Sequence, residues 1–236
     1  SVSSLISSAF PNTIVLAFSA ILIALLLAIP LGVLAAYNKD TWIDRLTSSI
    51  SVLGMSLPSF LAAVLISYLF AYKLGDWTNL NMTGSLFVVD DFGAGEKLQL
   101  KNLILPAVTL GIRPLAVIVH LTRTALIDEL SSDYILLARS KGFSIRYVIV
   151  FHALRNSMTS VVTAASGWFA GMLSGAVFVE YIFGWNGLGK LLVDALISVD
   201  FPLVMGIILV IATCFIIINI LVDLIYIWLD PRVRMN

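Results

Sequence analysis

Charged residues are scarce in this chain. Only 12% of its 236 residues are Asp, Glu, Lys or Arg, whereas soluble domains carry about 25%. Hydrophobic residues make up 60%, and the mean hydropathy is +1.02. A single soluble domain of this length could not cover its surface with so few polar groups. The composition therefore predicts a protein whose solvent is the lipid bilayer.

Cysteine, histidine and net charge are equally sparse. The single Cys214 excludes an intrachain disulfide and a cysteine-based metal cluster, and we interpret His120 and His152 as structural. A formal net charge of zero gives no basic field of the kind that attracts nucleic acid. The sequence contains no nucleophile–base set and no metal-spaced cluster, so we expect no catalysis, metal or cofactor in this chain. It opens at Ser1 without an initiator Met or a cleavable signal, and we expect a fragment or a processed form.

Five apolar segments are long enough to cross a bilayer, which takes about 20 mostly apolar residues. They cover residues 14–36, 46–74, 103–125, 157–183 and 201–229. The connections are residues 37–45, a polar loop at 75–102 that we expect to be irregular, a charged segment at 126–156 and a glycine-rich loop at 184–200. The predicted fold class is all-α, a polytopic transmembrane helix bundle that forms one domain over residues 1–236.

Lysine and arginine gather on one side of these spans, and cytoplasmic loops are the ones enriched in them. Nine lie at one face: Lys39, Arg45, Arg123, Arg139, Lys141, Arg146, Arg155, Arg232 and Arg234. Four lie at the other: Lys73, Lys97, Lys101 and Lys190. We therefore predict that the C-terminus is cytoplasmic and the N-terminus external. An external start with an odd number of spans favours a missing preceding helix.

Ionisable and small residues inside the spans are further candidates. Charge is costly within a membrane and indicates function by default; three residues carry it here: Arg113, Glu180 and Asp223. They pair with each other or with a partner subunit, or else Arg113 or Glu180 faces a transport pathway. Small residues recur every four positions in the fourth span: Gly167, Gly171 and Gly175. This spacing lets helices approach closely, either within the bundle or at a pathway or subunit interface.

The segment at 126–156 is too charged to span a membrane and too apolar to be a free loop. Four of its residues share one helical face by their spacing: Tyr134, Leu137, Ala138 and Lys141. Gly142 allows the backbone reversal that ends this helix, and Ser144 is placed to cap a second helix that runs to about Asn156. Two short helices joined at a glycine form an elbow on the cytoplasmic face. It is shaped either to enter a groove on a partner protein or to lie on lipid headgroups.

The elbow resembles the EAA loop of bacterial binding-protein-dependent ABC importer permeases, in the dipeptide/oligopeptide/nickel branch. Asp133 stands where the family has Glu, which shortens the side chain but keeps the charge. The resemblance assigns ATPase coupling to Asp133, Tyr134, Ala138, Arg139, Lys141, Gly142, His152, Arg155 and Asn156. Other stretches agree in the family's order over nearly the whole chain: residues 29–36, 56–60, 105–110, 179–189, 200–202 and 229–234. Members of this branch have a further N-terminal helix, which matches the odd number of spans.

The resemblance implies a transport subunit of the bacterial inner membrane with no ATP site of its own. ATP and Mg are expected on a partner, and the elbow is expected to be a coupling helix that docks there. The implied partners are a second homologous permease, two cytoplasmic ATPase subunits and an extracytoplasmic solute-binding protein, which mostly sets specificity for peptides or similar solutes. The alternative is a self-sufficient secondary transporter or channel, in which the elbow is an interfacial anchor.

Residues 184–190 match the spacing of a phosphate-binding P-loop up to Lys190. Leu191 follows where Ser or Thr should hold Mg²⁺, no parallel strand is predicted before it, and the predicted topology places it outside. We therefore interpret it as a turn at the outer mouth of the pathway, which contacts the binding protein or gates access.

Overall fold

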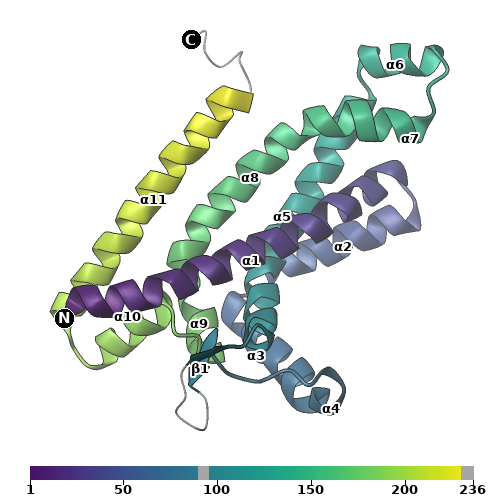
Figure 1. Cartoon of the computed structure of the whole chain (residues 1–236). Coiled ribbons are helices and arrows are strands. Elements are labelled where there is room, and N and C mark those ends of the chain that lie inside the picture. The colour runs from purple at the N-terminus through teal and green to yellow at the C-terminus, as the bar shows by residue number, and fades with distance from the viewer. Residues whose placement is uncertain (90–95, 230–236) are drawn as a thin grey trace. The chain divides into compact units, whose positions relative to one another are not determined.

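A computed structural model describes residues 1–89 and 96–229, without the side chains of residues 89, 96, 173–175, 223 and 225–229. Its long helices are α1 (Val2–Tyr37), α5 (Lys101–Leu130), α8 (Leu154–Gly175) and α11 (Phe201–Leu229) (Figure 1). The shorter ones are α2 (Trp42–Ser56), α3 (Ser59–Ile66), α4 (Gly75–Thr78), α6 (Asp133–Ser140), α7 (Ile145–Val148), α9 (Val177–Phe183) and α10 (Leu188–Ile197). Two segments are π-helical: η1 (Ser67–Lys73) and η2 (Ile149–Ala153).

Among the described residues, three helices are long and apolar enough to cross a membrane: α1, α5 and residues 201–222 of α11. Two interrupted helix pairs bring the number to five if each pair crosses as one span: α2 with α3–η1, and α7–η2–α8 with α9. Pro58 lies at the break in the first pair. It has no N–H to donate to the preceding turn and it disfavours helical backbone at Leu57, and its own backbone is extended ahead of α3 (φ −61°, ψ 139°). The all-α polytopic class predicted from the sequence is confirmed.

Two connections expected to be loops contain regular structure. Residues 75–102 include α4 and a short antiparallel ribbon, β1 (Phe87–Val89) against β2 (Glu96–Leu98), with Val88 opposite Lys97. Residues 184–200 include α10, whose Leu188 and Ala195 are buried. The glycine-rich interpretation was wrong here because leucine and alanine recur at helical spacing directly after the glycines, and their burial outweighs the local glycine content.

The first helix begins at Val2, well before the apolar run that starts at residue 14. Its serine-rich first turns still carry an apolar face, because Ile6 and Ala9 pack with Leu188 of α10 and Ile207 of α11. Tertiary burial of one stripe therefore keeps a polar stretch helical.

The chain divides into two compact units, which are described separately. Unit 1 comprises residues 1–23, 57–111 and 169–220, and its core joins the start of α1 to α10 and α11. Unit 2 comprises residues 24–56, 112–168 and the described residues from 221 onwards. Its core lies beneath the elbow and joins α1, α5, α6, α7 and η2.

Candidate functional site

The elbow exists, and a glycine forms its joint. The helix α6 ends in a Schellman arrangement: Phe143 N donates to Ala138 O (3.4 Å) and Gly142 N donates to Arg139 O (2.9 Å). Gly142 has a φ of +89°, which glycine adopts without the strain that a Cβ would add. The next helix starts at once, because the Ser144 hydroxyl accepts from Tyr147 N (3.4 Å) as its N-cap.

Both outer limits of the elbow differ from the sequence-based prediction. The helix α5 continues to Leu130, past the predicted end at residue 125, and α7, η2 and α8 follow one another without a break from Ile145 to Gly175. The predicted second helix therefore does not end near Asn156. No proline or glycine lies between residues 145 and 166, so nothing in the sequence ends the helix before the apolar span that follows.

A small apolar core fixes the elbow to the ends of α1 and α5. Ile135 of α6 is 1% exposed and packs with Leu126 of α5, Val148 of α7 and Ala36 of α1. Figure 1 shows α6 folded back beside α7. Because these contacts are apolar and buried, the elbow is attached to α5 as one packed body within unit 2.

A polar contact reinforces this attachment. The Tyr134 hydroxyl donates to the Glu129 carboxylate at the end of α5 and accepts from Asn156 Nδ2 of α8 (3.0 Å). Partial burial, and then the neighbouring Glu129 carboxylate, raise the pKa of the Tyr134 phenol. Two residues assigned to coupling, Tyr134 and Asn156, thus join three helices.

The elbow exposes large apolar side chains, here called the exposed elbow residues: Leu136, Leu137, Phe143, Tyr147 and Phe151. Phe143 stacks on Tyr147 (ring centroids 5.2 Å apart), and Tyr147 contacts Phe151 (4.8 Å). His152 packs its ring edge-on to Tyr147 (5.7 Å). The elbow also exposes four basic residues: Arg139, Lys141, Arg146 and Arg155. Asp133 is also exposed, at the first turn of α6.

Glu180 lies in unit 1 and is 0% exposed. Its carboxylate accepts from the Thr13 hydroxyl (2.7 Å), Gly189 N (2.7 Å) and Lys190 N (3.1 Å). The Thr13 hydroxyl in turn accepts from Leu188 N (2.8 Å). The first three N–H groups of α10, which no intrahelical carbonyl can serve, are therefore satisfied by two side chains from α1 and α9.

The glycines that follow Glu180 make room for this contact. A Cβ on Gly189 would lie 2.6 Å from Val177 Cα, and one on Gly187 would overlap the Glu180 carboxylate. Trp185 is also 0% exposed, and its Nε1 donates to Asn12 O (3.0 Å). The segment 180–190 is consequently a tightly built turn with a buried carboxylate at its centre.

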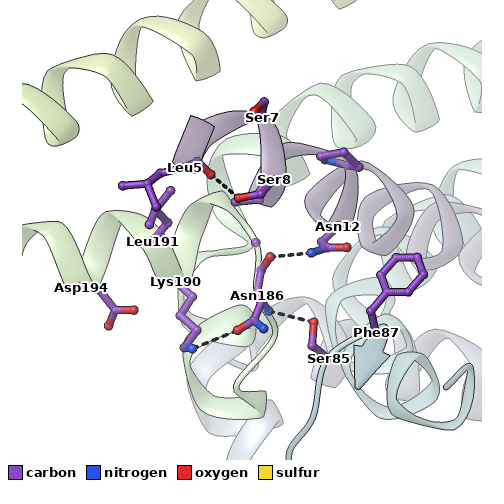
Figure 2. Close-up of a pocket in the computed structure, with 13 residues that line it drawn as sticks. Leu5, Ser7, Ser8, Asn12, Ser85, Phe87, Asn186, Lys190, Leu191 and Asp194 are labelled. Atoms are coloured by element: carbon purple, nitrogen blue, oxygen red, sulfur yellow. Dashed lines mark hydrogen bonds between the residues drawn. The ribbon is translucent and has the colours of Figure 1, made fainter. Parts of the chain in front are cut away.

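A polar cavity of about 580 Å³ adjoins this turn in unit 1 (Figure 2). Asn12 Nδ2 donates to Asn186 O (2.8 Å), Asn186 N donates to Ser85 Oγ (3.3 Å), and Lys190 Nζ donates to Asn186 Oδ1 (3.1 Å). The N–H groups of Gly189 and Lys190, which a P-loop would offer to phosphate, are already bonded to Glu180. This segment is therefore not arranged as a nucleotide site.

The remaining candidates lie apart. Arg113 is exposed in unit 2, and its guanidinium carbon is 5.9 Å from the ring centroid of Trp168 in α8. A Cβ added at Gly167 or Gly171 would meet no atom within 4 Å, so no other helix approaches these positions closely in the part of the chain that the structure describes. The surroundings of Gly175 and the side chain of Asp223 lie outside what the structure describes.

One ion pair escaped sequence reasoning. Arg123 near the end of α5 binds both carboxylate oxygens of Asp44 in α2, through Nε and through Nη2 (2.7 Å). The two residues are 79 positions apart in the sequence, and neither belongs to a recognised motif, so no sequence pattern predicts that they pair.

Known proteins resemble this chain along most of its length. A family described as the binding-protein-dependent transport system inner membrane component matches residues 28–235. A dipeptide transport system permease protein, DppB of Haemophilus influenzae, is 38% identical over 240 residues, which cover 95% of this chain and 71% of that protein. The "Probable D,D-dipeptide transport system permease protein DdpB" of Escherichia coli is 36% identical over 239 residues, covering 95% of this chain and 70% of that protein. The structure also superposes on a chain of the MetNI methionine ABC transporter in an inward-facing conformation, with a TM-score of 0.77, 15% identity and 96% of each chain covered.

Proposed function

Because this chain belongs to the family of binding-protein-dependent transport system inner membrane components, we propose that it is the permease subunit of an ATP-driven importer of peptides or similar small solutes. It would form half of the translocation pathway beside a second, homologous permease. Two cytoplasmic ATPase subunits would bind ATP and Mg, and an extracytoplasmic binding protein would deliver the solute.

The observation that carries this proposal is the elbow. It is fixed to unit 2 by the buried Ile135 and by the Tyr134–Asn156 contact, whereas its Leu137 and Phe151 are 59% and 61% exposed. Exposed apolar side chains gathered on a rigid element indicate an interaction surface. Aromatic and arginine side chains are enriched in such surfaces, and both are present here.

The proposed role of the elbow is to transmit the ATPase cycle. A short helix pair that enters a groove on the ATPase would be pushed when the ATPase subunits close. Since the elbow is packed onto α5 through Leu126, the push would reach the membrane helices of unit 2 rather than bend the elbow alone.

Leu137→Asp tests the docking. Leu100→Asp is the matched control, because Leu100 is equally exposed (60%, against 59% for Leu137) and lies in the connection predicted to be external. A charge placed in a buried interface is strongly unfavourable, so we expect Leu137→Asp to reduce recovery of the ATPase with the tagged permease at least about tenfold. The control should recover it at the wild-type level.

Uptake in proteoliposomes separates this function from a self-sufficient transporter. The assembled complex should take up solute only when ATP is hydrolysed, and the binding protein should be stabilised against heat by dipeptides in a ligand screen. Uptake by the purified chain alone, driven by an ion gradient, would contradict the ATPase coupling. A binding protein that ignores every peptide would remove the peptide assignment and leave the permease role intact.

A further inference from the structure

Arg123 and Asp44 form a bidentate ion pair inside unit 2. Both carboxylate oxygens of Asp44 are bonded by Arg123, through Nε and Nη2 (2.7 Å), and the second also accepts from Asp40 N (3.0 Å). The Asp44 side chain is 5% exposed and that of Arg123 is 21% exposed. Bidentate arginine–carboxylate contacts are short, strong and fixed in orientation. The pair therefore holds the first turn of α2 at a defined place on α5.

Stability alone is a poor account of such a pair. Desolvating two charges costs about as much as their attraction returns, and apolar residues of similar size often serve stability as well. The pair also fixes the relative orientation of α2 and α5, because the planar guanidinium holds both carboxylate oxygens and so resists both separation and rotation. The position of the pair in unit 2 indicates what this fixed orientation is for.

The helix α5 lies at the centre of unit 2. Its Leu126 belongs to the core beneath the elbow, together with Ile135. A Cβ on Gly32 of α1 would overlap Thr122 of α5 (2.6 Å to its Cβ), so the backbone of α1 at Gly32 packs directly against the Thr122 side chain. The far end of α2 also approaches α5, since a Cβ on Gly54 would lie 3.1 Å from that of Ala116.

The contact of α2 with α5 thus combines a close apolar approach at Gly54 with a charged attachment at Asp44. The charged end lies nearer in sequence to the elbow, since Arg123 precedes Leu126 by a single turn of α5. A displacement of α5 that arrives through the elbow therefore meets the ion pair first.

We infer that the Asp44–Arg123 ion pair is the positioning contact through which movement of the elbow and α5 is passed to α2. This inference rests on the proposed importer function, and it assigns to these two residues the coupling of ATP hydrolysis to the motion of the membrane helices. With the pair broken, the elbow still docks and ATP is still hydrolysed, but α2 no longer follows α5.

The test measures ATP hydrolysed per solute imported, in proteoliposomes that hold the assembled complex and the peptide selected on its binding protein. Asp44→Asn and Arg123→Gln should each raise this ratio about fivefold, within the range found for residues that couple distant sites. The double variant should be no worse than either single one, because both remove the same interaction.

Matched controls remove the same charges nearby. Asp128→Asn in α5 and Arg45→Gln in α2 change exposed side chains close to the pair in sequence and should leave the ratio within about twofold of the wild type. A purely stabilising pair would lower the melting temperature of the complex and leave the ratio unchanged, and that result overturns the inference. So does a control variant that raises the ratio as much as Asp44→Asn.

A second measurement needs no weakened variant. Spin labels on Trp42→Cys in α2 and Asp128→Cys in α5, in a Cys214→Ser background, report the separation of the two helices with the ion pair intact. It should be the same within about 2 Å in the nucleotide-free and ATP-bound complexes, because linked helices move as one body. A larger change between the two states overturns the inference. Import by the wild-type complex without ATP would overturn the proposed function itself. Because this is measured on the wild type before any variant, it is distinguished from a failure of the inference about the ion pair.

Discussion

Replacing Glu180 by alanine should strongly destabilise the protein, because this carboxylate serves the buried start of α10. The change removes the acceptor for the Thr13 hydroxyl, for Gly189 N and for Lys190 N. Thr13 and Gly189 are buried, so water cannot easily replace what they lose. The alanine side chain also leaves a void where Glu180 was fully enclosed.

The magnitude follows from the donors left without a partner. Each buried donor that loses its acceptor costs about 1–3 kcal/mol, and relief of the buried charge offsets part of this sum. We therefore expect a loss of about 3 kcal/mol in the free energy of unfolding. For a chain of this length, that corresponds to a fall of about 6–12 °C in melting temperature. Glu180→Gln keeps the size and one acceptor, and should fall between alanine and the wild type.

The assay is the fraction of detergent-solubilised protein that stays monodisperse on size-exclusion chromatography after heating. Asp200→Ala is the matched control, since Asp200 Oδ1 accepts from Leu203 N (3.1 Å) at the start of α11 but is exposed. An exposed N-cap contributes about 1 kcal/mol, so the control should lose about 2–4 °C. Equal shifts for the two variants would refute the argument that Glu180 acts as a buried cap.

Two glycine predictions follow from backbone and space. Gly142→Ala places a Cβ at a φ of +89°, which costs about 1–2 kcal/mol. The joint of the elbow should loosen, and recovery of the ATPase in pull-downs should fall. The control Gly75→Ala, where a Cβ has open space, should leave recovery unchanged. Gly189→Ala forces a Cβ to within 2.6 Å of Val177 Cα, whereas the Cβ of Gly167→Ala meets no atom within 4 Å. Gly189→Ala should therefore lower the melting temperature by several degrees, and Gly167→Ala should leave it unchanged. The reverse order would contradict the packing of the turn.

Composition and local patterns predicted much of the fold. Long apolar runs predicted membrane-crossing helices, because lipid demands about 20 apolar residues for each crossing. The described residues contain three helices that are long and apolar enough, or five if each bent pair is one span. Gly142 and Ser144 predicted the joint of the elbow, because helix ends are decided by groups a few residues away. The same local rules failed at α10 and at the start of α1, where burial against distant helices decided the outcome.

The candidate site divides in the same way. The elbow residues could be named from the sequence, yet nothing in it indicated that Tyr134 and Asn156 touch, or that Ile135 rather than Tyr134 faces the core. Glu180 was recognised as a costly charge in a span, but its partners were beyond reach of sequence reasoning, since Thr13 lies 167 residues away.

By itself the sequence determined that this chain is a membrane protein with a two-helix elbow, because hydropathy, helix caps and turn glycines are local signals that can be read along the chain. Only the tertiary structure decided that Glu180 caps a helix rather than faces open space, and that Arg123 holds Asp44. Those contacts join segments far apart in the chain, and a pairing over such a separation leaves no periodic trace in either segment.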